Sequence, residues 1–277
     1  MSDLLGSLDR FLEAAARVSK LRALRPVERG LTRAMQRAFL AQRKGFMRRF
    51  GYLRRYFEAE ITEAITERDW QAAFDEAMGE TEGAFTGAIT AAARKAMRAG
   101  ARKAITDIGM RLSFTLRNPR AVAYLQAIGA ARVTAINETT RQYLRTVIAN
   151  GVAEGWSYDR MASAIIERYK EFAVGRPQQH IDSRAHLIAV TEAGEAYEHA
   201  NYIVGQDLRD AGIEMEKHWS TMGDNRVSDG CLENEADGDD GWVPFDYVYQ
   251  GGGTPCQRPL RFPGCRCDLM VRRKGTD

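Results

Sequence analysis

Apolar residues recur every three or four positions along most of the first 210 residues, which is the spacing of one face of an α-helix. The first stripe predicts a helix that ends near Leu24, because Arg25-Pro26 should interrupt it. A second helix is predicted from about Pro26 to Phe50, and further stripes lie within 57–78. The first hundred residues are therefore predicted to be helical.

Capping residues mark the helices that follow. Asn118 is a typical N-cap residue, and Pro119 suits the first helical position. This helix is predicted to stop at Asn150-Gly151 and to be the longest in the chain. A shorter helix should begin at Ser157, and another should span about 182–208.

The stretch from Glu214 to Arg273 differs from everything before it. It is rich in turn-forming residues and poor in helical patterns, which predicts a small α+β or β-rich module. The predicted fold class is therefore mainly α with a C-terminal α+β module. The chain also has its four cysteines here: Cys231, Cys256, Cys265 and Cys267.

Two of these cysteines, Cys265 and Cys267, are two residues apart, so on an extended backbone both thiols point to the same face. All four cysteines could share one zinc ion, with His218 as an alternative ligand. The spacing lacks the paired C-x-x-C knuckles of a zinc ribbon. Buried thiols without a metal, or a disulfide, remain open alternatives.

Charge is strongly segregated, although the formal net charge is only +3. Residues 1–55 carry fourteen Lys or Arg against four acids, whereas residues 56–93 carry nine acids against one Arg. Such blocks favour packing against neighbouring helices, other subunits or DNA. Mutual neutralisation between antiparallel helices is the alternative. The candidate docking or DNA-contacting residues are Arg43, Lys44, Arg48, Arg49, Arg54 and Arg55.

Several motifs follow one another in the C-terminal half: Ala189-Val190-Thr191-Glu192, Lys217-x-Trp219-x-Thr221, Asp224-x-Arg226-Val227, Cys231 and Pro263-x-Cys265-Arg266-Cys267. Their order resembles the Mu F-like minor head proteins of tailed phages. The resemblance covers roughly residues 120–272. It departs from the family at Val190, where an arginine is usual, and at Ser228, where many relatives have a cysteine.

The resemblance implies a minor capsid or head morphogenesis protein inside the phage head, with portal, capsid or scaffold proteins and packaged DNA as partners. It implies a location in the virion near the portal, after assembly in the host cytoplasm. We expect a Mu F-like domain at 118–277, with the cysteine module at 214–273, and a separate helical docking region at 1–117. Deleting residues 1–55 should then leave the C-terminal domain folded. Residues expected to hold the motifs in place are Glu192, Trp219, Asp224, Arg226 and Arg266.

Two other functions compete with this interpretation: a DNA-binding internal protein ejected with the genome, and a metal-dependent hydrolase. The sequence contains no H-E-x-x-H motif, no nucleophile elbow and no phosphate-cradling glycine motif, so we expect no enzyme activity. Glu195 and His199 are spaced for a surface pair on a helix. No apolar run is long enough to cross a membrane, so no membrane partner is expected.

Overall fold

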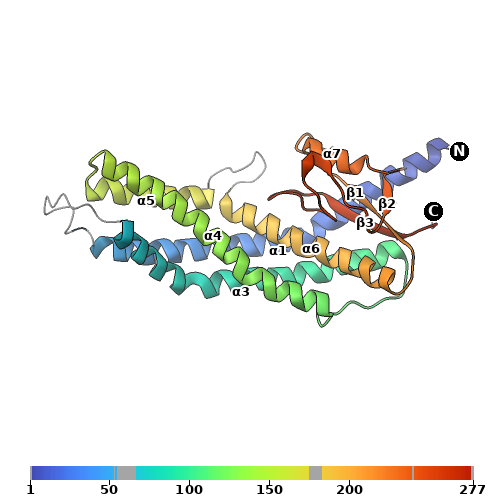
Figure 1. Cartoon of the computed structure of the whole chain (residues 1–277), viewed down its shortest axis with the longest axis horizontal. Helices are drawn as coiled ribbons and strands as arrows, with labels where there is room; N and C mark the ends of the chain where they lie inside the picture. Colours follow the sequence, from blue (N-terminus) through green and yellow to red (C-terminus); the bar gives the residue numbers. More distant parts are fainter. Residues whose placement is uncertain (1, 53, 55–66, 175–182, 239, 276–277) are drawn as a thin grey trace. The chain divides into compact units, whose positions relative to one another are not determined.

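The computed structural model describes residues 2–52, 54, 67–174, 183–238 and 240–275. Helices dominate, and three short strands lie near the C-terminus (Figure 1). The predicted class, mainly α with a C-terminal α+β module, is confirmed. In chain order the elements are α1 (Ser2–Tyr52), α3 (Glu67–Ile108), α4 (Pro119–Ala153), α5 (Tyr158–Val174), α6 (Arg184–Asp210), β1 (Met215–Ser220), α7 (Asp229–Glu235), β2 (Trp242–Pro244), the 3-10 turn η1 (Gly251–Gly253) and β3 (Asp268–Arg273).

The predicted break at Arg25-Pro26 is wrong, since α1 runs without interruption through Pro26. A proline inside a helix costs about 3 kcal/mol, through a lost hydrogen bond and a clash with the preceding turn. Pro26 is exposed, so water can reach the carbonyl that loses its partner. Leu24 and Leu31, on either side of Pro26, are each 2 % exposed. Burial of this apolar face offsets the local cost, which a propensity argument alone does not capture.

The start of α4 follows the prediction, because the Asn118 side chain accepts a hydrogen bond from the N–H of Arg120 at 2.9 Å. Its end does not. The helix continues through Asn150-Gly151 to Ala153, and with 35 residues it is shorter than α1, with 51. A Cβ at Gly151 would lie 2.6 Å from the sulfur of Met161. This glycine therefore provides space for packing rather than a helix stop.

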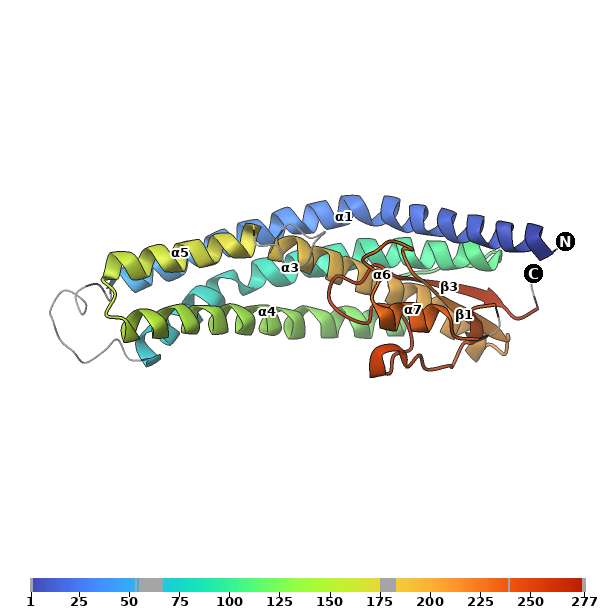
Figure 2. The same cartoon turned by 90° about the horizontal axis from the view of Figure 1, so that it is seen from above.

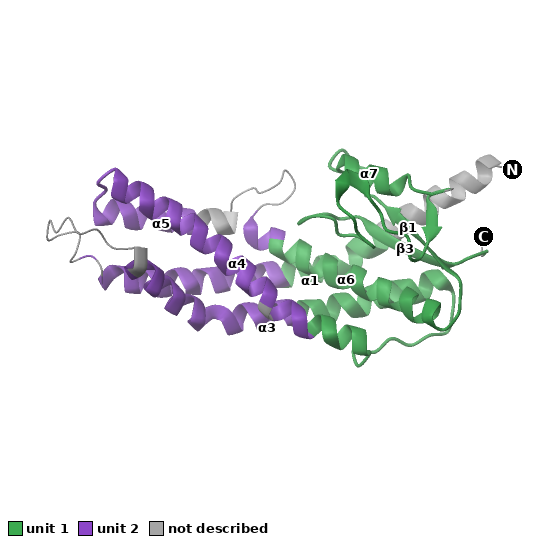
Figure 3. Cartoon of the chain, in the orientation of Figure 1, with its two compact units in different colours: residues 1–30, 91–125, 188–277 green, residues 31–90, 126–187 purple. Residues whose placement is uncertain are grey.

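The chain forms two compact units, each assembled from separate stretches (Figure 3). Unit 1 comprises residues 1–30, 91–125 and 188–277, and unit 2 comprises residues 31–90 and 126–187. The long helices contribute to both. The predicted division at residue 118 does not coincide with these units, and it stays a prediction.

In unit 1 the sheet has the strand order β2-β1-β3, and both pairings are antiparallel. Trp219 of β1 pairs with Leu269 of β3, and Lys217 lies between Val243 and Val271. The sheet lies beside α6, as Figure 2 shows, and Leu269 and Val271 share a core with the alanine-rich face of that helix.

Close helix packing in unit 1 depends on a glycine of α3. A Cβ at Gly100 would lie 2.8 Å from the carbonyl carbon of Tyr197 on α6, and closer still to its oxygen. Only glycine leaves room for this backbone contact.

Unit 1 also includes the first part of α1. Leu24 belongs to its apolar core, and the buried Lys20 pairs with Glu198 of α6. Deleting residues 1–55 would remove both side chains, which weighs against the expectation that the remainder stays folded; that expectation stays a prediction. Among the described helices, none is long and apolar enough to span a membrane.

Unit 2 shows what happens to the segregated charges of α1. Arg49 pairs with Glu76 at 2.6 Å and with Glu80 at 2.6 Å, and Arg48 lies 3.3 Å from Glu80. These contacts match the alternative of neutralisation between helices. The other candidate docking residues differ in environment: Arg43 is half-buried, Lys44 is exposed, Arg54 lies over the Tyr158 ring, and Arg55 is outside the described residues.

Candidate metal centre

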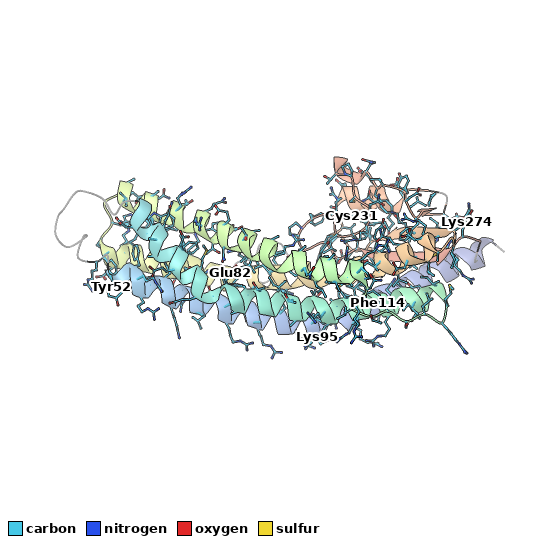
Figure 4. The ribbon with its side chains drawn as sticks, turned by 60° about the horizontal axis from the view of Figure 1, so that its bottom comes forward. Tyr52, Glu82, Lys95, Phe114, Cys231 and Lys274 are labelled. Carbon is cyan, nitrogen blue, oxygen red and sulfur yellow. The ribbon has the colours of Figure 1, made fainter. Side chains whose placement is uncertain are left out.

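Three of the four cysteines meet inside the C-terminal module. Cys231 lies in the first turns of α7, while Cys265 and Cys267 lie on the turn that leads into β3. Their sulfurs are all within 4.8 Å of one another, and each residue is at most 4 % exposed. Figure 4 labels Cys231 among the side chains of the module. The predicted same-face placement of Cys265 and Cys267 is therefore realised, with Cys231 as the third member.

The other two predicted ligands lie outside this group of three sulfurs. Cys256 is half-buried and exchanges backbone hydrogen bonds with Tyr249. Nδ1 of His218 lies 2.6 Å from the carbonyl oxygen of Gly241, and its ring lies near Trp242. His218 neighbours Trp219 on β1, so the two side chains point to opposite faces of the strand. The structure thus gathers three thiols and leaves Cys256 and His218 apart from them.

Ser228 also belongs to this site, although the sequence analysis assigned it no role there. It is the N-cap of α7, yet its side chain makes no capping hydrogen bond. Its hydroxyl instead accepts a hydrogen bond from Arg261 at 3.3 Å and interacts with the Cys231 thiol. A serine at an N-cap normally bonds the first turn of its helix. The Ser228-x-x-Cys231 spacing was the available signal, because one helical turn brings these side chains together.

Arg261 reaches the site through a gap that two glycines leave open. A Cβ at Gly230 would lie 2.8 Å from the guanidinium carbon, and one at Gly252 would lie 2.9 Å from it. The guanidinium also donates a hydrogen bond to the carbonyl of Gly251 at 3.3 Å. A positive charge is therefore fixed beside the sulfur group.

The thiols influence one another electrostatically. Hydrogen bonds from Cys265 and Cys267 lower the pKa of Cys231 to about 2, and the hydroxyl of Ser228 and Arg261 add to this effect. The same contact with Cys231 raises the pKa of Cys265 to about 11. The group therefore favours one thiolate that two neighbouring thiols stabilise. Thiolates are the form in which cysteine binds metals.

The motif residues surround this group. Trp219 is fully buried and makes an edge-to-face contact with Tyr249, with ring centroids 5.2 Å apart. Arg266 is half-buried between the two buried cysteines. Asp224 accepts a hydrogen bond from the N–H of Arg226 at 3.1 Å, which fixes the turn that was predicted there.

The Ala189-Val190-Thr191-Glu192 segment of α6 is joined directly to the cysteine turn. The hydroxyl of Thr191 accepts a hydrogen bond from the N–H of Gly264 at 3.0 Å. Glu192 of the same segment is 5 % exposed, so its carboxylate is buried. The hydrogen bond links the two motifs within unit 1.

A buried ionic cluster lies behind the cysteine turn, and the sequence analysis missed it. Lys20 donates hydrogen bonds to Glu198 and to the carbonyl of Cys267, and it lies 3.9 Å from Asp268. Lys103 lies 3.4 Å from Asp268 and bonds the carbonyl of Leu269. Lys20 stands four residues before the buried Leu24, so its place on the apolar face of α1 was the available signal.

The predicted pair of Glu195 and His199 is held by a third residue. Arg258 donates a hydrogen bond to Glu195 at 2.6 Å and lies 3.2 Å from Nδ1 of His199. The imidazole stacks on Tyr124, with ring centroids 4.2 Å apart. Burial, with Arg258 nearby, lowers the pKa of His199 to about 4. The imidazole is therefore neutral at physiological pH.

Comparison with known proteins bears directly on this arrangement. Residues 142–270 match the family model described as Phage Mu protein F like protein. This region of the chain is Mu F-like. The matched region begins within α4, ends within β3, and includes the three clustered cysteines, Ser228 and the Thr191 segment. No curated protein and no solved structure matches the chain.

The resemblance derived from the motif order is thus confirmed, and the Mu F-like family points to phage head morphogenesis and to a virion-associated protein.

Proposed function

We propose that this Mu F-like chain is a minor structural protein inside the phage head, associated with the portal during assembly. The observation that carries the proposal is the family match over residues 142–270. The matched region has a built interior: the cysteine turn, α6 and β3 are tied together by the Thr191 hydrogen bond and the buried ion pairs. A rigid module of this kind suits a structural component.

The docking surface should consist of charges that the chain does not neutralise itself. Arg48 and Arg49 are paired with acids of α3, which makes them weak candidates. Arg22 and Arg25 of α1 are exposed and line a hollow in unit 1. These two arginines are better placed to meet an acidic partner surface.

Contact with packaged DNA is a second candidate function, favoured by the same two arginines. DNA binding through phosphates weakens steeply with salt, with log K falling by about 0.9 per contact for each decade of salt concentration. Replacing Arg22 and Arg25 with glutamine should reduce that slope if they contact phosphates. An unchanged slope would assign the arginines to a protein partner instead.

A metal-dependent hydrolase is the least favoured alternative. Catalytic zinc sites keep an open position for water, whereas sites with mainly thiolate ligands are closed and structural. The three sulfurs here are buried. The expectation that the chain is not an enzyme stays a prediction, which an assay of the purified protein for metal-dependent hydrolysis would test.

Quantitative mass spectrometry of purified procapsids and mature virions tests the main proposal. We expect a small, fixed copy number per particle, far below that of the major capsid protein, together with cross-links to the portal protein. Presence in procapsids without portal cross-links would reject portal association. Absence from both particles would reject a structural role.

A further inference from the structure

We propose that Cys231, Cys265 and Cys267 bind one zinc ion as a three-thiolate site whose fourth corner faces the hydroxyl of Ser228. The inference concerns the metal chemistry of the module, and it does not depend on the portal or DNA proposals. It revises the four-cysteine site expected from the sequence, because it excludes Cys256 and His218.

The sulfur spacing is the first argument. The Sγ atoms of Cys231 and Cys265 are 3.9 Å apart. A zinc ion binds sulfur at about 2.3 Å, so two sulfurs of a tetrahedral site lie about 3.8 Å apart. A disulfide requires about 2.05 Å and would leave the third thiol alone in a buried position. Three mutually close sulfurs fit a shared cation better than any pairing.

The fourth corner is the second argument. Ser228 and Cys231 are separated by one helical turn, and the Ser228 hydroxyl interacts with the Cys231 thiol instead of capping α7. The hydroxyl is therefore an oxygen in contact with one of the three sulfurs, which makes it the candidate for the fourth position of a tetrahedral site. Gly230 and Gly252 leave the space that the Arg261 guanidinium occupies beside Ser228.

Charge is the third argument. Zinc with three thiolates carries a net charge of −1, which a buried site must compensate. Arg261 bonds the Ser228 hydroxyl and supplies a positive charge at that corner. Lys20 bonds the carbonyl of Cys267 from the opposite side of the turn. The surroundings therefore suit an anionic metal centre.

The structural consequence concerns a stretch with little regular structure. Between α7 and β3 only a three-residue strand and a 3-10 turn occur among the described residues. A metal that joins Cys231 to Cys265 and Cys267 would close this loop and fix its ends. Its role would be to hold the module together, in keeping with buried, mainly thiolate sites.

The experiment uses the full chain, purified under reducing conditions from cells supplied with zinc. Elemental analysis should give one zinc per chain, and Co²⁺ exchanged into the site should show sulfur-to-cobalt charge-transfer absorption. Cys231→Ser and Cys267→Ser should each lose the bound metal. Cys256→Ser is the matched control, because it removes a cysteine of the same module outside the sulfur group, and it should keep the metal.

Ser228→Cys provides a test that does not depend on a damaged protein. It should add a fourth thiolate and raise the charge-transfer absorbance of the Co²⁺ form by about one third. Unchanged absorbance would place Ser228 outside the fourth corner and overturn that part of the proposal. Two results would overturn the site itself: a reduced, folded wild-type chain that binds neither Zn²⁺ nor Co²⁺, or loss of metal from Cys256→Ser equal to that from Cys231→Ser.

Discussion

Lys20→Met is the substitution whose effect the structure defines best. The lysine side chain is 4 % exposed, and its ammonium meets the carboxylates of Glu198 and Asp268, which are 0 % and 1 % exposed. Burial opposes the charging of Lys20, but these carboxylates outweigh it and raise the pKa of the lysine. Methionine keeps most of the apolar stem and removes only the charge, so the variant isolates the ionic contribution.

The expected loss of stability follows from the buried carboxylates that remain after the ammonium is removed. Without Lys20, the buried carboxylates of Glu198 and Asp268 lose the cation that contacts both of them, and Lys103 remains beside Asp268. Removing one partner of a buried pair costs about 3–5 kcal/mol, because the remaining charge is desolvated without compensation. Total stability is about 5–15 kcal/mol for a typical domain, so the loss should be a large fraction of the whole.

Hydrogen exchange provides a readout local to unit 1, since the N–H of Leu269 donates to Glu198 at 3.0 Å. Lys20→Met should speed exchange at Leu269 and lower the midpoint of urea unfolding followed by fluorescence of the buried Trp219. Lys95→Met on the exposed face of α3 is the matched control and should change neither.

A double-mutant cycle separates charge from packing. The double variant Lys20→Met, Glu198→Gln removes one charge of each sign and leaves Lys103 to pair with Asp268. It should lose less stability than the sum of the two single variants. A loss equal to that sum would show that the two residues are energetically independent, and the reasoning would be refuted.

Two further predictions concern the packing of α3 against α6 and the dependence of stability on pH. In thermal melts, Gly100→Ala should destabilise the protein by about 3 kcal/mol, because the added carbon meets the backbone of Tyr197. Gly87→Ala is the control: a Cβ there meets no atom within 4 Å, so the substitution should be neutral or stabilising. Similar effects of both substitutions would contradict the packing argument. His199 has a pKa of about 4 in the folded state, where it is buried beside Arg258, and about 6.5 in the unfolded state. The unfolded chain therefore binds more protons between these pH values. The free energy of unfolding should fall by up to about 3 kcal/mol from pH 6.5 to 4. His199→Gln should flatten that part of the pH profile in urea titrations, and an unchanged slope would reject the assignment.

The sequence by itself determined the helical character of most of the chain, the start of α4 at Asn118-Pro119, and the distinct C-terminal module. These features are local: periodicity and capping act within a few residues of one another. The family relationship was also readable, because it depends on the order of motifs. The proximity of Cys265 to Cys267 followed from their spacing on an extended backbone.

Tertiary structure decided what local signals could not. α1 continues through Pro26 because Leu24 is buried against residues far along the chain. The choice of Cys231 over Cys256 as the third sulfur depends on how α7 packs, since Cys231 is 34 residues from Cys265 whereas Cys256 is much closer to it in sequence. Buried ion pairs such as Lys20 with Glu198 join residues 178 positions apart, and no local pattern encodes such a pairing. Burial and long-range contact are properties of the folded chain, which is why the site required the structure.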